Sequence, residues 1–245
     1  EAATERGIPV GHTPGVLTDA TADLTFSLLM AAARRIPEGI RKVKAGEWRI
    51  WEPMGLLGAD VWGATLGIIG LGRIGTAVAR RARAFKMRVL YDDPHRDPEL
   101  EEELGLLYTS FDNLLEQADF VTVHTPLVPE TRHLIDESAM RRMKRTAILI
   151  NAARGEIVDT DALVRALEEG WIARAALDVT DPEPIPSDHP LVGMENCIVV
   201  PHIGSATVTA RNRMAEMAAE NLLAGLEGER LPYCANPEVY EEGSR

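Results

Sequence analysis

Three polar residues, each placed just beyond an apolar run, have the types and spacing to reduce a 2-keto acid. Arg154, Glu183 and His202 each follow a segment typical of a buried strand. Because the carboxyl ends of parallel strands share one crevice, we expect these side chains to lie near one another. A guanidinium can hold a carboxylate through two hydrogen bonds, and an imidazole backed by a carboxylate can carry a proton near neutral pH. The sequence therefore predicts these three as catalytic residues.

The elements that must position them alternate between short apolar runs and amphipathic segments from residue 65 onward. This alternation predicts parallel βαβ units, and nearly continuous apolar runs predict strands covered by helices on both faces. We therefore expect an α/β fold built on a doubly wound parallel sheet of the Rossmann type. The expected strands are 65–70, 87–92, 119–126, 147–153, 173–179 and 197–201. The expected helices are 18–42, 73–85, 111–118, 136–143, 161–170 and 206–227.

A glycine-rich turn follows the first of these strands, with the pattern G-x-G-x-x-G at Gly70, Gly72 and Gly75. Between a strand and a helix, the first glycine permits a tight turn and the second lets a pyrophosphate approach the backbone. The third lets the helix pack closely on the sheet, and the helix N-terminus faces the anion. The pattern in this setting predicts a dinucleotide-binding turn, whereas an ordinary strand-to-helix turn is the alternative.

The end of the second expected strand carries two carboxylates, Asp92 and Asp93. Asp92 stands where an acidic residue binds the hydroxyls of the adenosine ribose. Two carboxylates would repel a 2′-phosphate, so we expect NAD(H) as the cofactor in preference to NADP(H). Arg96 lies close enough in sequence to weaken that argument.

Composition and charge argue against several other classes of protein. The net charge is −12, and the basic cluster at 34–44 has the spacing of a solvated helix face, so we expect no nucleic-acid partner. The longest apolar runs are too short to span a bilayer and no secretory segment opens the chain, so we expect no membrane association. Two cysteines in 245 residues favour reduced thiols in a cytoplasmic protein, with a disulfide as the alternative. The histidines lack metal-ligand spacing, so we expect no metal.

Five collinear segments resemble the D-2-hydroxyacid dehydrogenase family, and most closely its glyoxylate/hydroxypyruvate reductases. The segments are 67–75, 123–135, 150–167, 176–191 and 199–207. The resemblance implies an NAD-dependent oxidoreductase that transfers a hydride between a nicotinamide cofactor and a small 2-keto or 2-hydroxy acid. Glyoxylate and hydroxypyruvate are the expected substrates, with glycolate and D-glycerate as the products.

The same resemblance implies a role for each residue that matches a family motif. Arg154 would contact the substrate's carboxylate and carbonyl, His202 would be the acid/base, and Glu183 would hydrogen-bond the histidine. Asp178 would hold the nicotinamide carboxamide. The other implied cofactor contacts are Arg73 and Ile74 at the pyrophosphate, Thr125, Pro126 and Ala152 along the cleft, and Gly204 and Ser205 beside the histidine.

The resemblance also implies how the chain is divided into domains. Residues 16–206 would form the dinucleotide-binding domain. Residues 1–15 would be a remnant of a second, smaller, flavodoxin-like substrate domain, to which a C-terminal helix within 207–245 would return. The first residues look like the end of a helix entering a strand, so we expect the N-terminal part of that domain to be absent from the chain.

An irregular segment at 46–62, which contains Trp48 and Trp51, resembles the family's dimer arm. Exposed tryptophans in such a segment favour an interface, so we expect a homodimer. The alternative is that these tryptophans pack on their own domain.

Two other functions remain open from the sequence. One is a non-catalytic sensor or scaffold that binds NAD(H) on the same fold, because a fold alone does not settle function. The complete set of Arg154, Glu183 and His202 argues against a sensor, and the absent part of the substrate domain argues for it. The other is a reductase of a different 2-keto acid.

Overall fold

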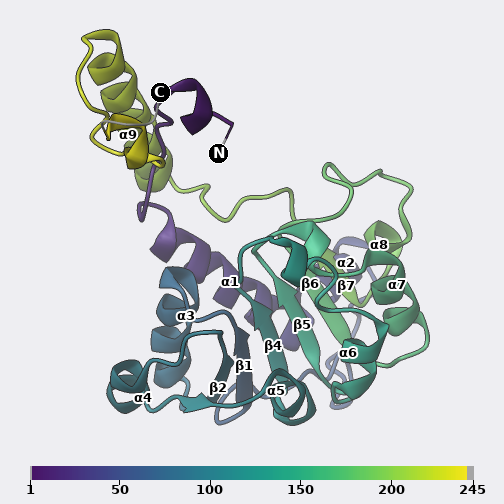
Figure 1. The fold of residues 1–245 in the computed structure, drawn as a ribbon. Helices are drawn as coiled ribbons and strands as arrows, with labels where there is room; N and C mark the ends of the chain where they lie inside the picture. The colour runs from purple at the N-terminus through teal and green to yellow at the C-terminus, as the bar shows by residue number, and fades with distance from the viewer. Residues whose placement is uncertain (1, 242–245) are drawn as a thin grey trace. The chain divides into compact units, whose positions relative to one another are not determined.

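A parallel β-sheet organises the larger part of the chain. The computed structural model describes residues 2–241 of 245. Within these residues seven strands run parallel in the order β3-β2-β1-β4-β5-β6-β7 (Figure 1). The strands are β1 Thr65–Ile69, β2 Arg88–Asp92, β3 Leu107–Tyr108, β4 Phe120–Val123, β5 Ile148–Asn151, β6 Arg174–Leu177 and β7 Cys197–Val199. The expected doubly wound sheet of the Rossmann type is confirmed.

Helices connect the strands and cover both faces of the sheet (Figure 1). The α-helices are α1 Thr18–Ala33, α2 Ile36–Lys44, α3 Arg73–Ala84, α4 Pro98–Leu104, α5 Phe111–Gln117, α6 Glu137–Arg142, α7 Thr160–Glu168, α8 Pro190–Gly193 and α9 Val208–Leu226. Short 3₁₀ helices are η1 Thr4–Arg6, η2 Pro129–Thr131, η3 Gly155–Ile157 and η4 Pro237–Tyr240. Among residues 2–241, none of the helices combines the length and the apolar composition that a membrane span requires.

Two hydrophobic cores lie on opposite faces of the sheet. Leu149 of β5 belongs to the core formed with α5, α6 and α7, whereas its neighbours Ile148 and Ile150 belong to the core formed with α1 and α3. Successive side chains of a strand point to opposite faces. A strand covered on both faces must therefore be apolar at nearly every position, which explains the continuous apolar runs in the sequence.

The strand order reverses between β1 and β4, and this places several loops at one edge of the sheet. From β1 the chain builds outward through β2 and β3, then crosses back to pair β4 with the other side of β1. At the carboxyl edge the Gly70 N–H donates to the Asp92 carbonyl (2.9 Å), and the His124 N–H donates to the Ile69 carbonyl (2.7 Å). Ligands of open α/β sheets bind at such a switch point.

The single helix expected over 18–42 is instead two helices, α1 and α2. Pro37 is the reason, because proline lacks an N–H and is tolerated only in the first turn of a helix. The chain breaks at Arg35, which adopts a left-handed conformation (φ 53°), and α2 begins at Ile36. The prediction of one continuous helix was therefore wrong.

A buried carboxylate ties α2 to the start of β6. The Glu38 side chain is 6% exposed and accepts hydrogen bonds from the Arg35 Nε (3.1 Å) and from the Arg174 guanidinium. Burial alone would raise the pKa of the Glu38 carboxyl, but hydrogen bonds from its own backbone and from the two guanidinium groups outweigh burial and lower it. Glu38 is therefore an ionised anchor for the helix that precedes segment 46–62.

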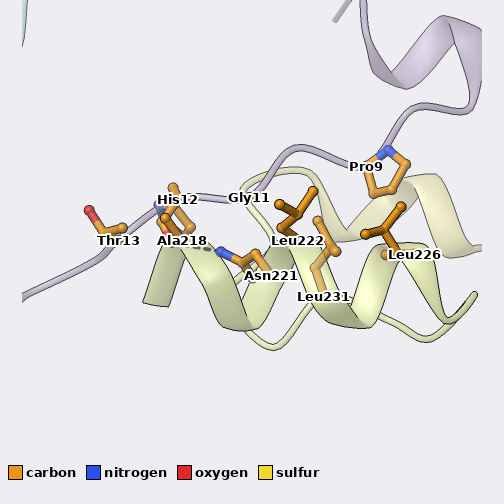
Figure 2. A pocket seen from close by; sticks show the side chains of 10 residues that line it. Pro9, Gly11, His12, Thr13, Ala218, Asn221, Leu222, Leu226 and Leu231 are labelled. Atoms are coloured by element: carbon orange, nitrogen blue, oxygen red, sulfur yellow. Dashed lines mark hydrogen bonds between the residues drawn. The ribbon is translucent and has the colours of Figure 1, made fainter. Parts of the chain in front are cut away.

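The described chain divides into two compact units, Thr21–Gly204 and a smaller unit formed by residues up to Ala20 together with those from Ser205. In the smaller unit the segment 9–13 runs along α9 (Figure 2). Asn221 of α9 is 5% exposed and joins the two ends of the chain, because its Nδ2 donates to the His12 carbonyl (3.1 Å) and its Oδ1 accepts from the Tyr233 N–H (2.9 Å).

A groove of about 370 Å³ lies between segment 9–13 and α9. Its apolar lining includes Pro9, Leu222, Leu226 and Leu231 (Figure 2). Leu222 and Leu226 are 63% and 76% exposed, so this face of α9 is only partly covered within its own unit.

Candidate active site

The glycine-rich turn between β1 and α3 has two glycines that the chain's own packing requires. Gly70 has a φ of 91°, and a Cβ there would lie 2.7 Å from the Thr125 nitrogen. A Cβ at Gly75 would lie 2.2 Å from the Gly70 carbonyl oxygen. A Cβ at Gly72, in contrast, would meet nothing within 4 Å in the described part of the chain. The turn therefore leaves open space directly over the backbone at Gly72, which fits a pyrophosphate.

The N-terminus of α3 supplies the donors that such an anion needs. The helix has 12 residues, and within the described chain no side chain caps it at Gly72. Its first N–H groups have no partner within the helix, and its dipole favours negative charge there. Gly72 and Arg73 are exposed, and Ile74 is half-buried. The residues present thus fit a dinucleotide phosphate.

Asp92 and Asp93, two neighbouring carboxylates at the end of β2, have different environments and contacts. Asp92 is the last residue of the strand, and burial, with the charge of Asp93 beside it, raises the pKa of its carboxyl. Asp93 accepts from the Leu71 N–H through Oδ2 and from the His95 N–H through Oδ1, both at 2.8 Å. The sequence indicated only a repulsive charge at Asp93, whereas the structure shows that this carboxylate also fixes the glycine turn.

The histidine and the glutamate expected to form a pair lie in hydrogen-bond contact. His202 Nδ1 is 2.6 Å from Glu183 Oε1, and the two side chains are 49% and 41% exposed. A carboxylate only accepts hydrogen bonds, so Nδ1 carries the proton of this contact and Nε2 is left to meet a ligand. The pair can therefore exchange a proton with a molecule in the crevice.

A buried aspartate holds the loop on which His202 lies. Asp178 follows β6, is 2% exposed, and accepts from the N–H groups of Ile203 (2.6 Å) and Gly204 (2.8 Å). The His202 N–H donates to the Asp178 carbonyl (2.9 Å), and His202 itself adopts a left-handed conformation with φ 50°. The sequence did not predict this positioning role, because it depends on a contact across 25 and 26 residues.

Arg154 lies in the loop after β5, the strand next to β6. Its guanidinium is exposed and donates from Nη1 to the Ala153 carbonyl (2.6 Å). The Asn151 side chain shapes this loop, donating to the Arg154 carbonyl (2.8 Å) and accepting from the Ala153 N–H (3.0 Å). A Cβ at Gly155 would lie 2.0 Å from the Thr180 carbonyl oxygen, so the loops after β5 and β6 touch. Among the described residues no hydrogen bond joins the Arg154 guanidinium to Glu183 or His202.

A cavity of about 400 Å³ adjoins the Glu183–His202 pair. Its polar lining also includes Asp178, Thr180 and Ser187, and its apolar lining is Pro184, Ile185, Val192, Val199, Val200 and Pro201. Within residues 2–241 no group of three or more His, Cys, Asp or Glu residues could hold a metal ion.

Three further expected cofactor residues lie at the same edge of the sheet. Thr125 and Pro126 follow β4, and Ala152, 8% exposed, follows β5. Ser205 is the first residue of the smaller unit's second segment, and its place beside the histidine stays a prediction.

His124, at the end of β4, is a titratable group to which the sequence assigned no chemistry. Its Nε2 is 2.9 Å from the Thr122 Oγ1, and its buried Nδ1 has no partner within residues 2–241. Burial lowers the pKa of His124 to about 4. The imidazole is therefore uncharged at neutral pH and adds no positive charge to the switch point.

Comparison with known proteins identifies what this chain is similar to. The family model described as the NAD-binding domain of D-isomer specific 2-hydroxyacid dehydrogenases matches residues 26–204. The glyoxylate reductase of Korarchaeum cryptofilum (strain OPF8) is 57% identical over 238 residues, which are 97% of this chain and 72% of that relative.

Two solved structures extend the comparison. The TT0316 protein from Thermus thermophilus is 54% identical with a TM-score of 0.90, over 96% of this chain and 73% of that one. The D-lactate dehydrogenase from Aquifex aeolicus, complexed with NAD and lactic acid, is 32% identical with a TM-score of 0.83, over 93% of this chain and 72% of that one.

The matched region contains the whole glycine turn, the aspartate at the end of β2 and the hydrogen-bonded histidine and glutamate. The resemblance expected from the five sequence segments is confirmed. The chain belongs to the D-isomer specific 2-hydroxyacid dehydrogenase family and carries its NAD-binding domain.

Proposed function

We propose that this protein is an NAD(H)-dependent reductase of small 2-keto acids, with glyoxylate as its substrate and hydroxypyruvate as a second one. The observation that carries the proposal is the 2.6 Å contact of His202 with Glu183 at the sheet edge that also bears the glycine turn. The similarity to a relative named glyoxylate reductase, at 57% identity, supports the choice of substrate. The products are glycolate and D-glycerate.

Each catalytic side chain then has one task. NADH, when bound, would supply the hydride that reduces the keto carbon. His202 donates the proton from Nε2 to the keto oxygen, and Glu183 at Nδ1 orients the ring and stabilises its charged form. Arg154 binds the substrate carboxylate through two hydrogen bonds and thereby aligns the carbonyl.

The cofactor contacts follow from the glycine turn and the strand ends around it. We infer that Gly70, Gly72 and Gly75, with Arg73 and Ile74, surround the pyrophosphate. Asp92 binds the ribose hydroxyls, and its carboxylate together with that of Asp93 favours NAD(H) over NADP(H). Each carboxylate oxygen of Asp178 keeps a lone pair for the nicotinamide carboxamide in addition to its backbone contact. The remaining contacts are Thr125, Pro126, Ala152, Gly204 and Ser205.

We further propose that residues 16–206 are the dinucleotide-binding domain and that 1–15 and 207–245 belong to the substrate domain. The division of the described chain at Thr21 and Gly204 into two compact units supports this assignment. A cytoplasmic location is proposed on the two cysteines, which are unpaired in the described structure.

A homodimer is proposed through segment 46–62. Trp48, Trp51 and Met54 on this segment are 65%, 77% and 76% exposed, and Ile40 and Val43 of the adjoining α2 are 50% and 56% exposed. Apolar side chains gathered in this way mark interfaces. Light scattering should give twice the mass of the chain, and a monomeric mass would contradict the dimer.

The test of function combines turnover with cofactor binding on one sample. NADH oxidation is followed by absorbance with glyoxylate, hydroxypyruvate and pyruvate, and NADH is titrated by fluorescence. Turnover that is fastest with glyoxylate supports the proposal, and fastest turnover of pyruvate contradicts the substrate. A chimera that adds the part of the Korarchaeum relative outside the match is measured alongside. Tight NADH binding without turnover in both proteins would contradict the enzyme and favour an NAD(H) sensor.

A further inference from the structure

An arginine close to the proposed ribose site is held by a glutamate on α4. The Arg96 Nε donates to Glu101 Oε1 and its Nη2 donates to Oε2, both at 2.8 Å. The guanidinium carbon also lies 5.6 Å from the centre of the Tyr108 ring. The edge of the guanidinium formed by Nε and Nη2 is therefore engaged by a carboxylate of this chain.

The glutamate is itself held in place from β2, next to which α4 lies (Figure 1). The Glu101 side chain is 15% exposed, and its Oε1 accepts from the hydroxyl of the buried Tyr91 at 2.8 Å. That hydroxyl accepts in turn from the Asp97 N–H (3.0 Å), at the residue that caps α4. Hydrogen bonds from Arg96 and then Tyr91 lower the pKa of the Glu101 carboxyl to about 2, so it is ionised at neutral pH.

The turn that separates Arg96 from the ribose site is also fixed. Asp93, next to Asp92, accepts from the Leu71 N–H and the His95 N–H at 2.8 Å each, which ties this turn to the glycine turn. A free guanidinium in such a turn could bind a phosphate through two hydrogen bonds and offset the two carboxylates. Bound to Glu101, the guanidinium cannot present its Nε/Nη2 edge to a phosphate, and the carboxylate beside it offsets its charge.

We propose that Glu101 is a specificity-determining residue that withholds Arg96 from the 2′ position of the adenosine ribose and so favours NAD(H) over NADP(H). The inference rests on the proposed binding of the ribose by Asp92. Glu101 acts through Arg96 and does not touch the cofactor. Removing the Glu101 charge frees Arg96 to pair with a 2′-phosphate.

The experiment measures binding rather than turnover, with NAD⁺ and NADP⁺ as ligands that differ only in the 2′-phosphate. In calorimetric titrations, Glu101→Gln should strengthen NADP⁺ binding about tenfold and leave NAD⁺ binding within about twofold. The double variant Glu101→Gln with Arg96→Ala should return NADP⁺ affinity to that of the parent. Arg96→Ala alone should change neither affinity, and its exposed side chain makes it a folded control if Glu101→Gln is unstable.

Three results would overturn the role of Glu101. They are an unchanged NADP⁺ affinity in folded Glu101→Gln, a gain that persists in the double variant, and a loss of NADP⁺ affinity in Arg96→Ala alone. The last result would mean that Arg96 already contacts the 2′-phosphate in the parent. A parent that binds NAD⁺ and NADP⁺ equally contradicts the proposed NAD(H) preference and the inference together. A parent that prefers NAD⁺ with an unresponsive Glu101→Gln contradicts only the inference.

Discussion

Alanine at Gly72 and alanine at Gly75 add the same methyl group to one turn, and the structure predicts opposite consequences. At Gly72 the backbone is extended (φ −69°, ψ −167°) and a Cβ meets nothing within 4 Å of the described chain. Gly72→Ala should therefore fold normally and gain roughly 0.4–1 kcal/mol, because the unfolded chain becomes less flexible. At Gly75 a Cβ would lie 2.2 Å from a backbone oxygen, so α3 or the turn must move. Such overpacking costs about 1–3 kcal/mol.

The two variants are separated by thermal unfolding and NADH titration. For a domain of this size about 1 kcal/mol shifts the Tm by roughly 2–4 °C, so Gly75→Ala should lower it by about 2–12 °C. Gly72→Ala should raise the Tm by roughly 1–4 °C yet bind NADH about tenfold or more weakly, since the methyl group occupies the space over which the pyrophosphate approaches the backbone. Gly193→Ala on α8 is the control, because its Cβ also meets nothing within 4 Å of the described chain and lies outside the turn.

Two results would refute this reasoning. A Gly72→Ala variant that binds NADH as tightly as the parent would show that the pyrophosphate does not approach this part of the backbone. A Gly75→Ala variant with an unchanged Tm would show that α3 moves to accommodate the methyl group without a loss of stability. A Gly193→Ala variant that loses NADH affinity would remove the control.

Three further substitutions test other parts of the structure. Glu183→Gln should lower kcat roughly tenfold in the reduction of glyoxylate, because the His202 ring loses the carboxylate that orients it for proton transfer. Arg154→Ala should raise KM, lower kcat and reduce kcat/KM roughly 10- to 100-fold in steady-state kinetics. Glu38→Gln should cost about 1–3 kcal/mol in urea unfolding at pH 7, since it leaves Arg174 unpaired. Because the pKa of Glu38 is lowered in the folded protein, its stabilisation is present above about pH 4.5 and is lost as the pH falls further.

Each of these three predictions has a result that would contradict it. An unchanged kcat in Glu183→Gln would remove the assigned role of that carboxylate. A normal KM in Arg154→Ala would show that the guanidinium does not bind the substrate. Equal stability of Glu38→Gln and the parent at pH 7 would mean that the buried ion pairs contribute nothing net to folding.

The order of the major strands and helices could be predicted because the spacing of apolar residues that identifies each element lies within that element. Short apolar runs became strands and amphipathic segments became helices, whereas α4 was missed although its signals stood in the sequence. Asp97 caps it by accepting from the Leu100 N–H (3.0 Å), Pro98 opens it and Gly105 ends it in a left-handed conformation. β3 has two residues, too few for an alternating hydrophobic pattern to be recognised in the sequence.

The residues of the candidate site also divide into those that a local sequence pattern could predict and those that it could not. The glycine turn and Asp92 were predicted because their spacing lies within one βαβ unit. The contact of His202 with Glu183 was anticipated as a shared sheet edge, since parallel strands gather their carboxyl ends. The contact of Glu38 with Arg174 joins residues 136 positions apart, and no local pattern carries such information.

The proposed chemistry depends on exposed side chains, and an exposed side chain cannot order its own loop. At three strand ends a short polar residue binds the backbone of a loop at the carboxyl edge: Asp93 after β2, Asn151 at the end of β5 and Asp178 after β6. Asparagine and aspartate suit this task because their short side chains reach nearby backbone groups that no longer form hydrogen bonds within the sheet. Each lies at the end of an apolar run, so a polar residue there signals a fixed loop as well as a candidate ligand. His202 and Arg154 can therefore be exposed and still be held ready for a substrate.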